Sequence, residues 1–257
     1  MIANRISLIS MSLFFTILWV PWGQTEFLVD HWMKIGTFLA PVMLFIAFTS
    51  RARPRDPILS DTKLMSSVLL AIYLVHQFEE HWIDLLGREY PLHALLNNLL
   101  RQYFGENAYG AMTKEAIFII NTSAVWLTGF IAIARSPGHV FPAVAMAAIV
   151  LVNGLFHILQ GIATGTYNPG LATAVALFVP ISLLFYRELI SKSIASFQEV
   201  VWGIGWAIAA HALLFAGLLA SHVANLIPVT TYYFLLVVWA LLPACLFRHR
   251  SSSNSIA

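Results

Sequence analysis

The stretch VHQFEEHW, residues 75–82, places two histidines and two glutamates within six consecutive positions of an otherwise apolar segment. On a helix, positions three and four apart share a face, so His76, Glu79 and Glu80 are expected to point into a common sector. A carboxylate at the centre of a membrane helix costs about 2.5–3.5 kcal/mol, and less near the interface. These side chains therefore require a partner, a proton, a metal or access to water, unless they form a polar collar at the membrane surface.

A second polar stripe lies in LVNGLFHILQG, where Asn153 and His157 are four residues apart. Asn121 lies in the apolar segment before it. Imidazole nitrogens and carboxylate oxygens together suit zinc, iron or manganese. The predicted ligands of a divalent metal are His76, Glu79, Glu80 and His157. Glu79, Glu80, Asn121 and Asn153 are the candidate catalytic residues, although a lone buried histidine such as His157 is as readily a packing residue as a ligand.

His81 does not complete a known metalloprotease motif. An inverted zincin requires His-x-x-Glu-His, whereas His76 and His81 are five residues apart and therefore about 140° apart around a helix. We expect His81 to leave the site as an interfacial or supporting residue. The pattern assigns no role to His211 or His222.

The elements that position these residues are predicted to be membrane helices. Of 257 residues, 59% are hydrophobic and 10% are charged, against roughly 25% charged residues in soluble domains. Apolar segments long enough to cross a bilayer lie near 6–22, 33–49, 64–82, 115–134, 139–161, 170–186, 200–224 and 231–247. Because unpaired backbone groups are costly in hydrocarbon and no alternating strand pattern is present, the expected fold is an all-α polytopic bundle of about eight spans.

Composition also excludes several classes of protein. The single cysteine, Cys245, cannot form an intramolecular disulfide. The 14 basic and 12 acidic residues form no basic stripe for nucleic acid. The run 6–22 lacks a small-residue cleavage site, so it is interpreted as a retained span rather than a signal peptide. The remaining partners are the lipid bilayer and an apolar small molecule, and nothing in the sequence indicates an oligomeric state.

The distribution of basic residues predicts the orientation. With both termini inside, ten basic residues are cytoplasmic, namely Arg5, Arg51, Arg53, Arg55, Lys63, Arg135, Arg187, Lys192, Arg248 and Arg250. Four would be outside, namely Lys34, Arg88, Arg101 and Lys114. This bias favours an N-in, C-in protein of the cell (inner) membrane, with the candidate site in the outer half of the bilayer.

The chain divides into parts that follow this topology. Residues 1–63 hold two N-terminal spans and a basic loop, 64–186 a four-helix core, 187–247 two C-terminal spans and 248–257 a disordered tail. The outer connection 83–114 contains an amphipathic helix from about Leu92 to Phe104, expected to lie on the membrane as a lid.

The core resembles the HXXEE-domain family of small integral membrane proteins. Its name describes the string from His76 to Glu80, and the later block VNGLFHILQGIATGTYNPGLATA, residues 152–174, is similar to that family's Asn-x-x-x-His block followed by Tyr-x-Pro-Gly-x-x-Thr. The resemblance covers about residues 65–186 and implies a membrane domain with a suspected metal or catalytic site. Tyr167 from the second block is either a proton donor at the mouth of the site or an aromatic residue of the membrane interface.

Three functions fit these residues. A metal-dependent enzyme would activate water for hydrolysis of a lipid-like or apolar substrate, with the spare glutamate as general base. A metal-free isomerase or cyclase of the isoprenoid or sterol type would use the His76 and Glu80 pair as an acid, which resembles the emopamil-binding isomerases. A metal or proton carrier or sensor is the third, although "LMSSVLLAIY" and "FPAVAMAAIV" offer few polar residues for a path across the membrane.

Overall fold

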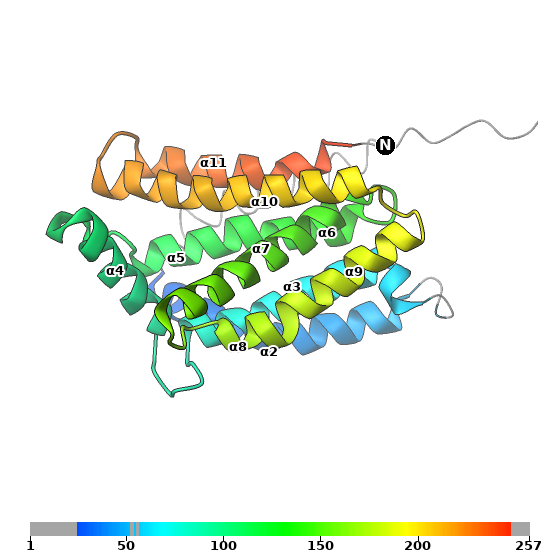
Figure 1. The fold of residues 1–257 in the computed structure, drawn as a ribbon, viewed down its shortest axis with the longest axis horizontal. Coiled ribbons are helices and arrows are strands. Elements are labelled where there is room, and N and C mark those ends of the chain that lie inside the picture. The colour runs from blue at the N-terminus through cyan, green and yellow to red at the C-terminus, as the bar shows by residue number, and fades with distance from the viewer. Residues whose placement is uncertain (1–24, 52–53, 55–56, 248–257) are drawn as a thin grey trace, which may run out of the picture.

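The computed structural model describes residue 54 and the ranges 25–51 and 57–247 (Figure 1). The predicted first span at 6–22, Arg53, Arg55 and the tail 248–257 lie outside the described residues. The described part is helical and contains no strand, only an isolated bridge between Ile83 and Glu89. The all-α expectation is confirmed.

The helices follow one another with short connections. Their bounds are α2 Glu26–Thr49, η1 Ile58–Ser60, α3 Thr62–His81, α4 Pro91–Phe104, η2 Glu106–Ala108, α5 Lys114–Ile120, η3 Asn121–Trp126, α6 Leu127–Arg135, α7 Phe141–Thr164, α8 Leu171–Thr173, η4 Ala174–Phe178, α9 Val179–Ser191, α10 Phe197–Leu218, η5 Leu219–Val223, α11 Val229–Leu241 and η6 Leu242–Ala244. Three of the η segments, η3, η4 and η5, are π-helical turns that continue their neighbours into longer helices.

Each predicted span within the described residues coincides with one helix or run of joined helices. Five of these are long and apolar enough to cross a membrane, namely Glu26–Thr49, Lys114–Arg135, Phe141–Thr164, Leu171–Ser191 and Phe197–Val223. The described helix α3 is not among the five, although it has 20 residues. Its C-terminal turns carry the polar residues His76, Gln77, Glu79, Glu80 and His81, which lower the hydropathy of the helix.

Local sequence explains where several helices begin and end. Asp61 caps α3 by accepting from the amide of Leu64, and Thr113 caps α5 by accepting from the amide of Ala116. Ser196 and Glu199 form a reciprocal capping box at the start of α10. Gly165 ends α7 in the left-handed conformation, with φ of 63°.

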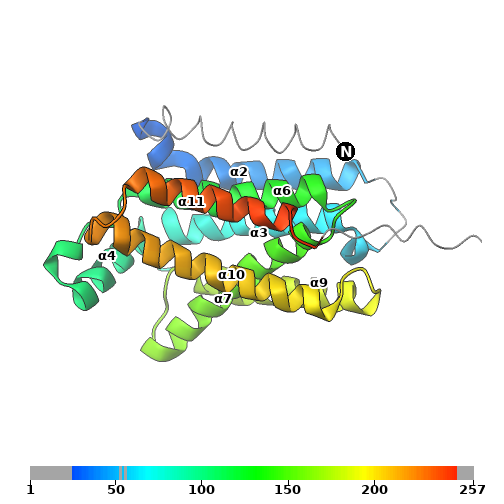
Figure 2. The same ribbon diagram turned by 90° about the horizontal axis from the view of Figure 1, so that it is seen from above.

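Helices α3 and α7 form the centre of the bundle, and α2, α6, α9 and α10 pack around them (Figures 1 and 2). The buried core includes Leu69 and Leu70 of α3 and the small residues of α7 from Ala143 to Ala148. Large apolar side chains such as Phe38 and Phe45 are exposed on α2, as expected for a surface that faces lipid. The C-terminal ends of α3 and α7 lie at the same end of the bundle as α4 (Figure 1).

Candidate metal centre

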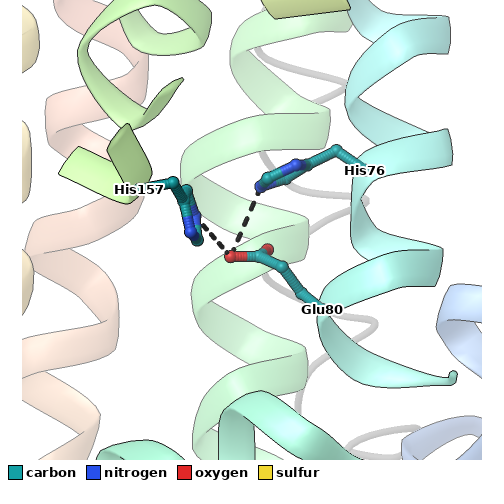
Figure 3. A group of neighbouring side chains, drawn as sticks. All are labelled: His76, Glu80 and His157. Carbon is teal, nitrogen blue, oxygen red and sulfur yellow. Dashed lines mark ion pairs between the residues drawn. The ribbon is translucent and has the colours of Figure 1, made fainter. Parts of the chain in front are cut away.

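Three side chains from the two central helices converge near that end of the bundle (Figure 3). His76 and Glu80 are one turn apart on α3, and His157 projects from α7. Glu80 Oε1 lies 3.4 Å from His76 Nε2 and 3.0 Å from His157 Nε2. All three residues are buried, with exposed fractions of 0%, 4% and 6% for His76, Glu80 and His157. One ligand atom from each lies within 4.8 Å of the others, so the group could hold a metal ion.

The hydrogen bonds of His76 fix its tautomer. His76 Nδ1 lies 2.6 Å from Thr173 Oγ1, and the same hydroxyl lies 2.6 Å from Glu79 Oε2. The single hydroxyl proton of Thr173 is donated to the carboxylate, so the contact with His76 requires that Nδ1–H donates to Thr173. The other nitrogen, His76 Nε2, is then a bare lone pair, and it is buried without a hydrogen-bond partner in the described structure.

His157 is oriented in the same way by Asn168. The Asn168 amide Nδ2 donates to the backbone carbonyl of His157 at 2.9 Å, which leaves its Oδ1 to accept from His157 Nδ1–H at 2.8 Å. His157 Nε2 therefore also presents a lone pair toward Glu80 Oε1. Two imidazole lone pairs and a carboxylate oxygen repel one another unless a cation or a proton lies among them. Metal-ligating histidines commonly have this arrangement, in which the second ring nitrogen donates to an outer acceptor.

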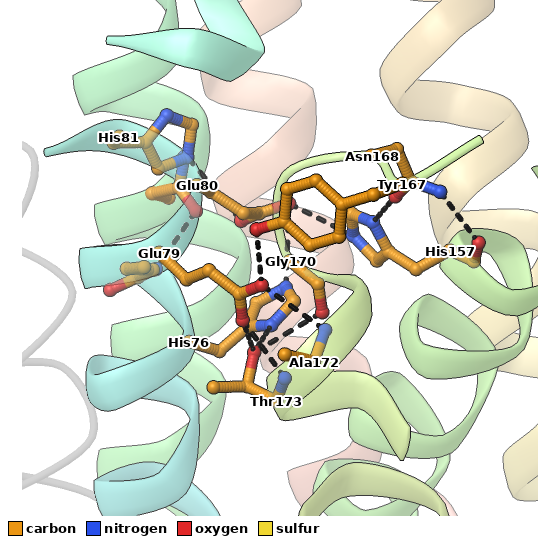
Figure 4. Close-up of polar contacts among 12 residues, drawn as sticks. His76, Glu79, Glu80, His81, His157, Tyr167, Asn168, Gly170, Ala172 and Thr173 are labelled. Carbon is orange, nitrogen blue, oxygen red and sulfur yellow. Dashed lines mark hydrogen bonds and ion pairs between the residues drawn. The ribbon is translucent and has the colours of Figure 1, made fainter. Parts of the chain in front are cut away.

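Glu79, a predicted ligand and catalytic residue, forms its hydrogen bonds with residues of the segment 167–173 (Figure 4). Its Oε1 accepts from the Tyr167 hydroxyl at 2.7 Å and from the Ala172 amide at 3.1 Å. Its Oε2 accepts from the Thr173 amide at 2.9 Å and from the Thr173 hydroxyl at 2.6 Å. Glu79 thus contacts the segment 167–173 and is not part of the three-residue group.

Tyr167 connects two loops at the end of the bundle. Besides donating to Glu79, its hydroxyl accepts from the Leu85 amide at 3.3 Å. Burial, together with the hydrogen bond to Glu79, raises the pKa of Tyr167, so the phenol keeps its proton. Its hydroxyl belongs to the hydrogen-bond network of the site, a contact that a purely interfacial aromatic residue would not make.

His81 contacts the site from the other side of α3. Its Nε2 lies 3.5 Å from Glu80 Oε2 and 3.4 Å from the Asn121 amide Nδ2. The expectation that His81 leaves the site holds for the three-residue group only, because the second oxygen of Glu80 reaches the opposite face of the helix. Only 4% of His81 is exposed, so its side chain is buried within the protein. Asn121 accepts from Gln77 Nε2 at 2.8 Å, a contact that sequence reasoning missed.

A small cavity opens beside His81. It is lined by Val29, Trp32, Met33, His81, Tyr90, His93, Lys114 and Ile117. The wall from α2 is apolar, whereas the polar residues come from α3, from α4, from the loop before α4 and, as Lys114, from α5. The cavity therefore lies between His81, at the edge of the site, and residues of α4 and of the loop before it.

The other predicted polar residues lie farther from the group. Asn153 is half-buried one turn before His157, and its Oδ1 has no hydrogen-bond partner in the described part of the chain. His211 contacts the carbonyl of Ala207 on its own helix and the ring of Phe156. His222 contacts Ser221. Neither histidine joins the three-residue group.

Gly170 covers the group at close range. A Cβ at this position would lie 2.7 Å from His76 Cε1, 2.8 Å from His157 Cε1 and 3.1 Å from Glu80 Cγ. Its φ of 93° is also in the left-handed region that favours glycine. The backbone at Gly170 therefore lies where no other residue type fits without moving the histidines.

One comparison with known proteins identifies the central region of the chain. A family model described as a protein of unknown function with HXXEE motif matches residues 67–185. This range contains the three-residue group and the segment 167–173, and it confirms the resemblance expected from the sequence. No curated protein and no solved structure matches the chain.

Proposed function

Because residues 67–185 match the HXXEE family, we propose that this protein is a metal-dependent membrane enzyme whose ligands are His76, Glu80 and His157. The observation that carries the proposal is the convergence of two Nε2 lone pairs on one carboxylate oxygen, with His76 Nε2 buried and without a partner. A divalent cation such as zinc, iron or manganese satisfies all three atoms at once.

The donor set favours a catalytic site over a structural one. Structural zinc sites have four protein ligands, whereas catalytic sites keep three, and two histidines with one glutamate are a known catalytic set. When bound, a metal in such a site activates water and polarises a carbonyl group. The proposed reaction is therefore hydrolysis of an ester or amide.

The surroundings support an apolar or lipid-like substrate. The ring of Phe178 lies 4.2 Å from that of His76, and the ring of Tyr73 lies 5.6 Å from it. Two helices beside the group, Phe141–Thr164 and Leu171–Ser191, are long and apolar enough to cross a membrane. We place the protein in the cell (inner) membrane, with the site in its outer half.

The remaining predicted residues have supporting roles in this proposal. Asn121 contacts His81, whose Nε2 lies 3.5 Å from the second oxygen of Glu80. Asn153 offers a carbonyl oxygen that has no hydrogen-bond partner among the described residues and is available to a polar group of the substrate. Tyr167 keeps its proton and donates to Glu79.

One observation also favours a metal-free acid and base pair. The 3.0 Å separation of His157 Nε2 and Glu80 Oε1 is a hydrogen-bond distance, so a shared proton would satisfy this pair. An isomerase or cyclase of isoprenoid type would use that proton. It would leave His76 Nε2 without a partner, which is why the metal is preferred.

Metal analysis of the purified protein tests the proposal. We expect about one transition metal ion per chain in the wild type and its loss in His76→Ala and His157→Ala, because each removes one of three ligands. His211→Ala is the matched control, since it removes a half-buried histidine from a neighbouring helix that is not part of the group. A wild-type protein without stoichiometric metal would overturn the metal proposal and favour the acid and base alternative. Bound metal without any hydrolytic turnover would instead favour a carrier or sensor.

A further inference from the structure

We propose that the two adjacent glutamates of the motif have different functions: Glu80 is a metal ligand, and Glu79 is a positioning residue that acts on His76 through Thr173. The inference rests on the proposed metal function for its effect on metal affinity. Its effect on the tautomer of His76 does not depend on a metal.

Glu79 caps a helix to which it does not belong. The helix Leu171–Ser191 begins directly after Gly170, which has no side chain to accept from the first free amides. The amides of Ala172 and Thr173 donate instead to the two oxygens of Glu79 from α3. A carboxylate at a helix N-terminus is also favoured by the helix dipole. Glu79 therefore links the start of this helix to α3 through two backbone hydrogen bonds.

This attachment places Thr173 between Glu79 and His76 (Figure 4). The Thr173 hydroxyl donates to Glu79 Oε2 and lies within 3.2 Å of the Gly170 carbonyl, so both of its other partners are acceptors. With its proton committed, the hydroxyl oxygen can only accept from His76 Nδ1–H. The result is a chain from carboxylate to hydroxyl to imidazole, which keeps His76 Nε2 unprotonated and aimed at Glu80.

The same contacts argue against Glu79 as a ligand. Its two oxygens accept four hydrogen bonds, two from hydroxyl groups and two from backbone amides. Binding a metal would require the carboxylate to give up several of these bonds and to release the helix it caps. Glu80 has the opposite environment, because its contacts in the described structure are the histidines His76, His81 and His157.

The test removes the hydroxyl of Thr173 and then restores it. Thr173→Val keeps the shape of the side chain without a hydroxyl, and Thr173→Ser keeps the hydroxyl without the methyl group. The first readout is the tautomer of His76 in chelator-treated protein, measured by ¹⁵N NMR with the signal assigned by its absence in His76→Ala. The second is the affinity for added Zn²⁺. Thr122→Val is the control, since Thr122 is a buried threonine whose hydroxyl contacts its own helix at Phe118.

We expect wild type, Thr173→Ser and Thr122→Val to show His76 protonated at Nδ1, and Thr173→Val to lose this preference. Loss of an outer hydrogen-bond partner typically weakens metal affinity 10- to 100-fold, so Thr173→Val should bind Zn²⁺ about that much more weakly, with recovery in Thr173→Ser. Glu79→Gln, which removes two of the four acceptor positions, should change both readouts in the same direction and provides a second variant if Thr173→Val fails to fold.

Two negative results are distinguishable. An unchanged His76 tautomer with unchanged Zn²⁺ affinity in Thr173→Val would overturn the positioning role of Thr173 and Glu79, while the metal site would stand. A wild-type protein that binds no Zn²⁺ would overturn the proposed function. In that case the tautomer measurement alone decides whether Glu79 and Thr173 position His76.

Discussion

At the scale of the residue, Gly170 is the position where the least chemical change should have the largest effect on the site. A methyl group added at Gly170 would lie within 2.8 Å of the Cε1 atoms of both histidines. In Gly170→Ala, we expect the histidines to be pushed apart and Zn²⁺ affinity to fall by at least about 10-fold, by analogy with the loss of an outer partner. Isothermal titration of purified protein measures this affinity.

Gly165→Ala is the matched control for that substitution. Gly165 also has positive φ, at 63°, but nothing lies within 4 Å of the place its Cβ would occupy. Both variants bear the backbone cost of a left-handed alanine, about 1–2 kcal/mol. Only Gly170→Ala should lose metal affinity. Equal affinity in the two variants would contradict the role of Gly170 as a close cover of the site.

The sequence predicts some residues of the site better than others. Residues that share a helix face are predictable, whereas contacts between residues far apart in the chain are harder to predict. His76 and Glu80 share a helix face, and His157 was placed at the same depth by the direction of its helix, so periodicity and topology were sufficient for the group. The contact between His76 and Thr173 joins residues 97 positions apart, and no periodicity reports it. Asn168 is eleven residues from His157, and no pattern in the sequence indicates that it fixes the orientation of this histidine. The adjacency of Glu79 and Glu80 also concealed their different partners.

At the scale of the element, the loop between α3 and α4 is held by one carboxylate. Asp84 accepts from the amides of Leu86 and Arg88, each at 2.9 Å, and its other oxygen lies 2.6 Å from the Arg88 guanidinium. Burial opposes ionisation of Asp84, but the hydrogen bonds from Arg88 and Leu86 outweigh it and hold the pKa of this carboxyl below its ordinary value. The loop in turn presents the Leu85 amide to Tyr167. The order of this loop therefore depends on an ionised Asp84.

The pH dependence follows from the sign of that shift. A carboxyl whose pKa is depressed in the folded protein stabilises it above the ordinary value of about 3.9, and the stabilisation is lost as pH falls through the folded value. We expect the amides of Leu86 and Arg88 to be protected from hydrogen exchange at pH 5 and to lose protection below about pH 4, after correction for intrinsic rates. Asp84→Asn should exchange rapidly at both pH values, whereas Glu89→Gln, at an exposed position in the same loop, should behave as wild type. Protection that persists in Asp84→Asn would show that another contact orders the loop.

The helices themselves were predictable to within a few residues, and the exceptions have physical causes. Helix α2 begins at Glu26, seven residues before the predicted boundary at 33, because Glu26 and Asp30 made its first turns appear too polar for a span. Those residues lie at the end of the bundle, where Asp30 pairs with Lys114 at 2.6 Å. The π-helical turns were not predicted, since a single inserted residue leaves no sequence signature. One of them, η4, follows Thr173 directly and carries Phe178 against His76.

At the scale of the whole molecule, the two ends of the bundle differ in their basic residues, and only one of them contains the three-residue group of His76, Glu80 and His157. The end with the candidate metal centre carries Lys34, Arg88, Arg101 and Lys114. The opposite end carries the described residues Arg51, Lys63, Arg135, Arg187 and Lys192. There, Thr62 bonds to the carbonyl of Ser136 and Ser60 bonds to Glu188, so the starts of α3 and the ends of α6 and α9 lie together (Figure 1). The positive-inside bias predicts that this end faces the cytoplasm.

The only cysteine tests this orientation without a fusion. Cys245 is exposed just after η6, at the end predicted to be cytoplasmic. A membrane-impermeant maleimide should label wild-type protein in inside-out vesicles and not in right-side-out vesicles. In a Cys245→Ser background, Thr166→Cys should show the opposite pattern, because Thr166 is exposed in the loop beside the metal centre. Cys245→Ser alone, which has no thiol, measures the background.

Labelling of Cys245 in right-side-out vesicles would show that the topology is the reverse of the predicted one. The candidate metal centre would then lie in the cytoplasmic half of the membrane, and a substrate would have to come from the inner leaflet.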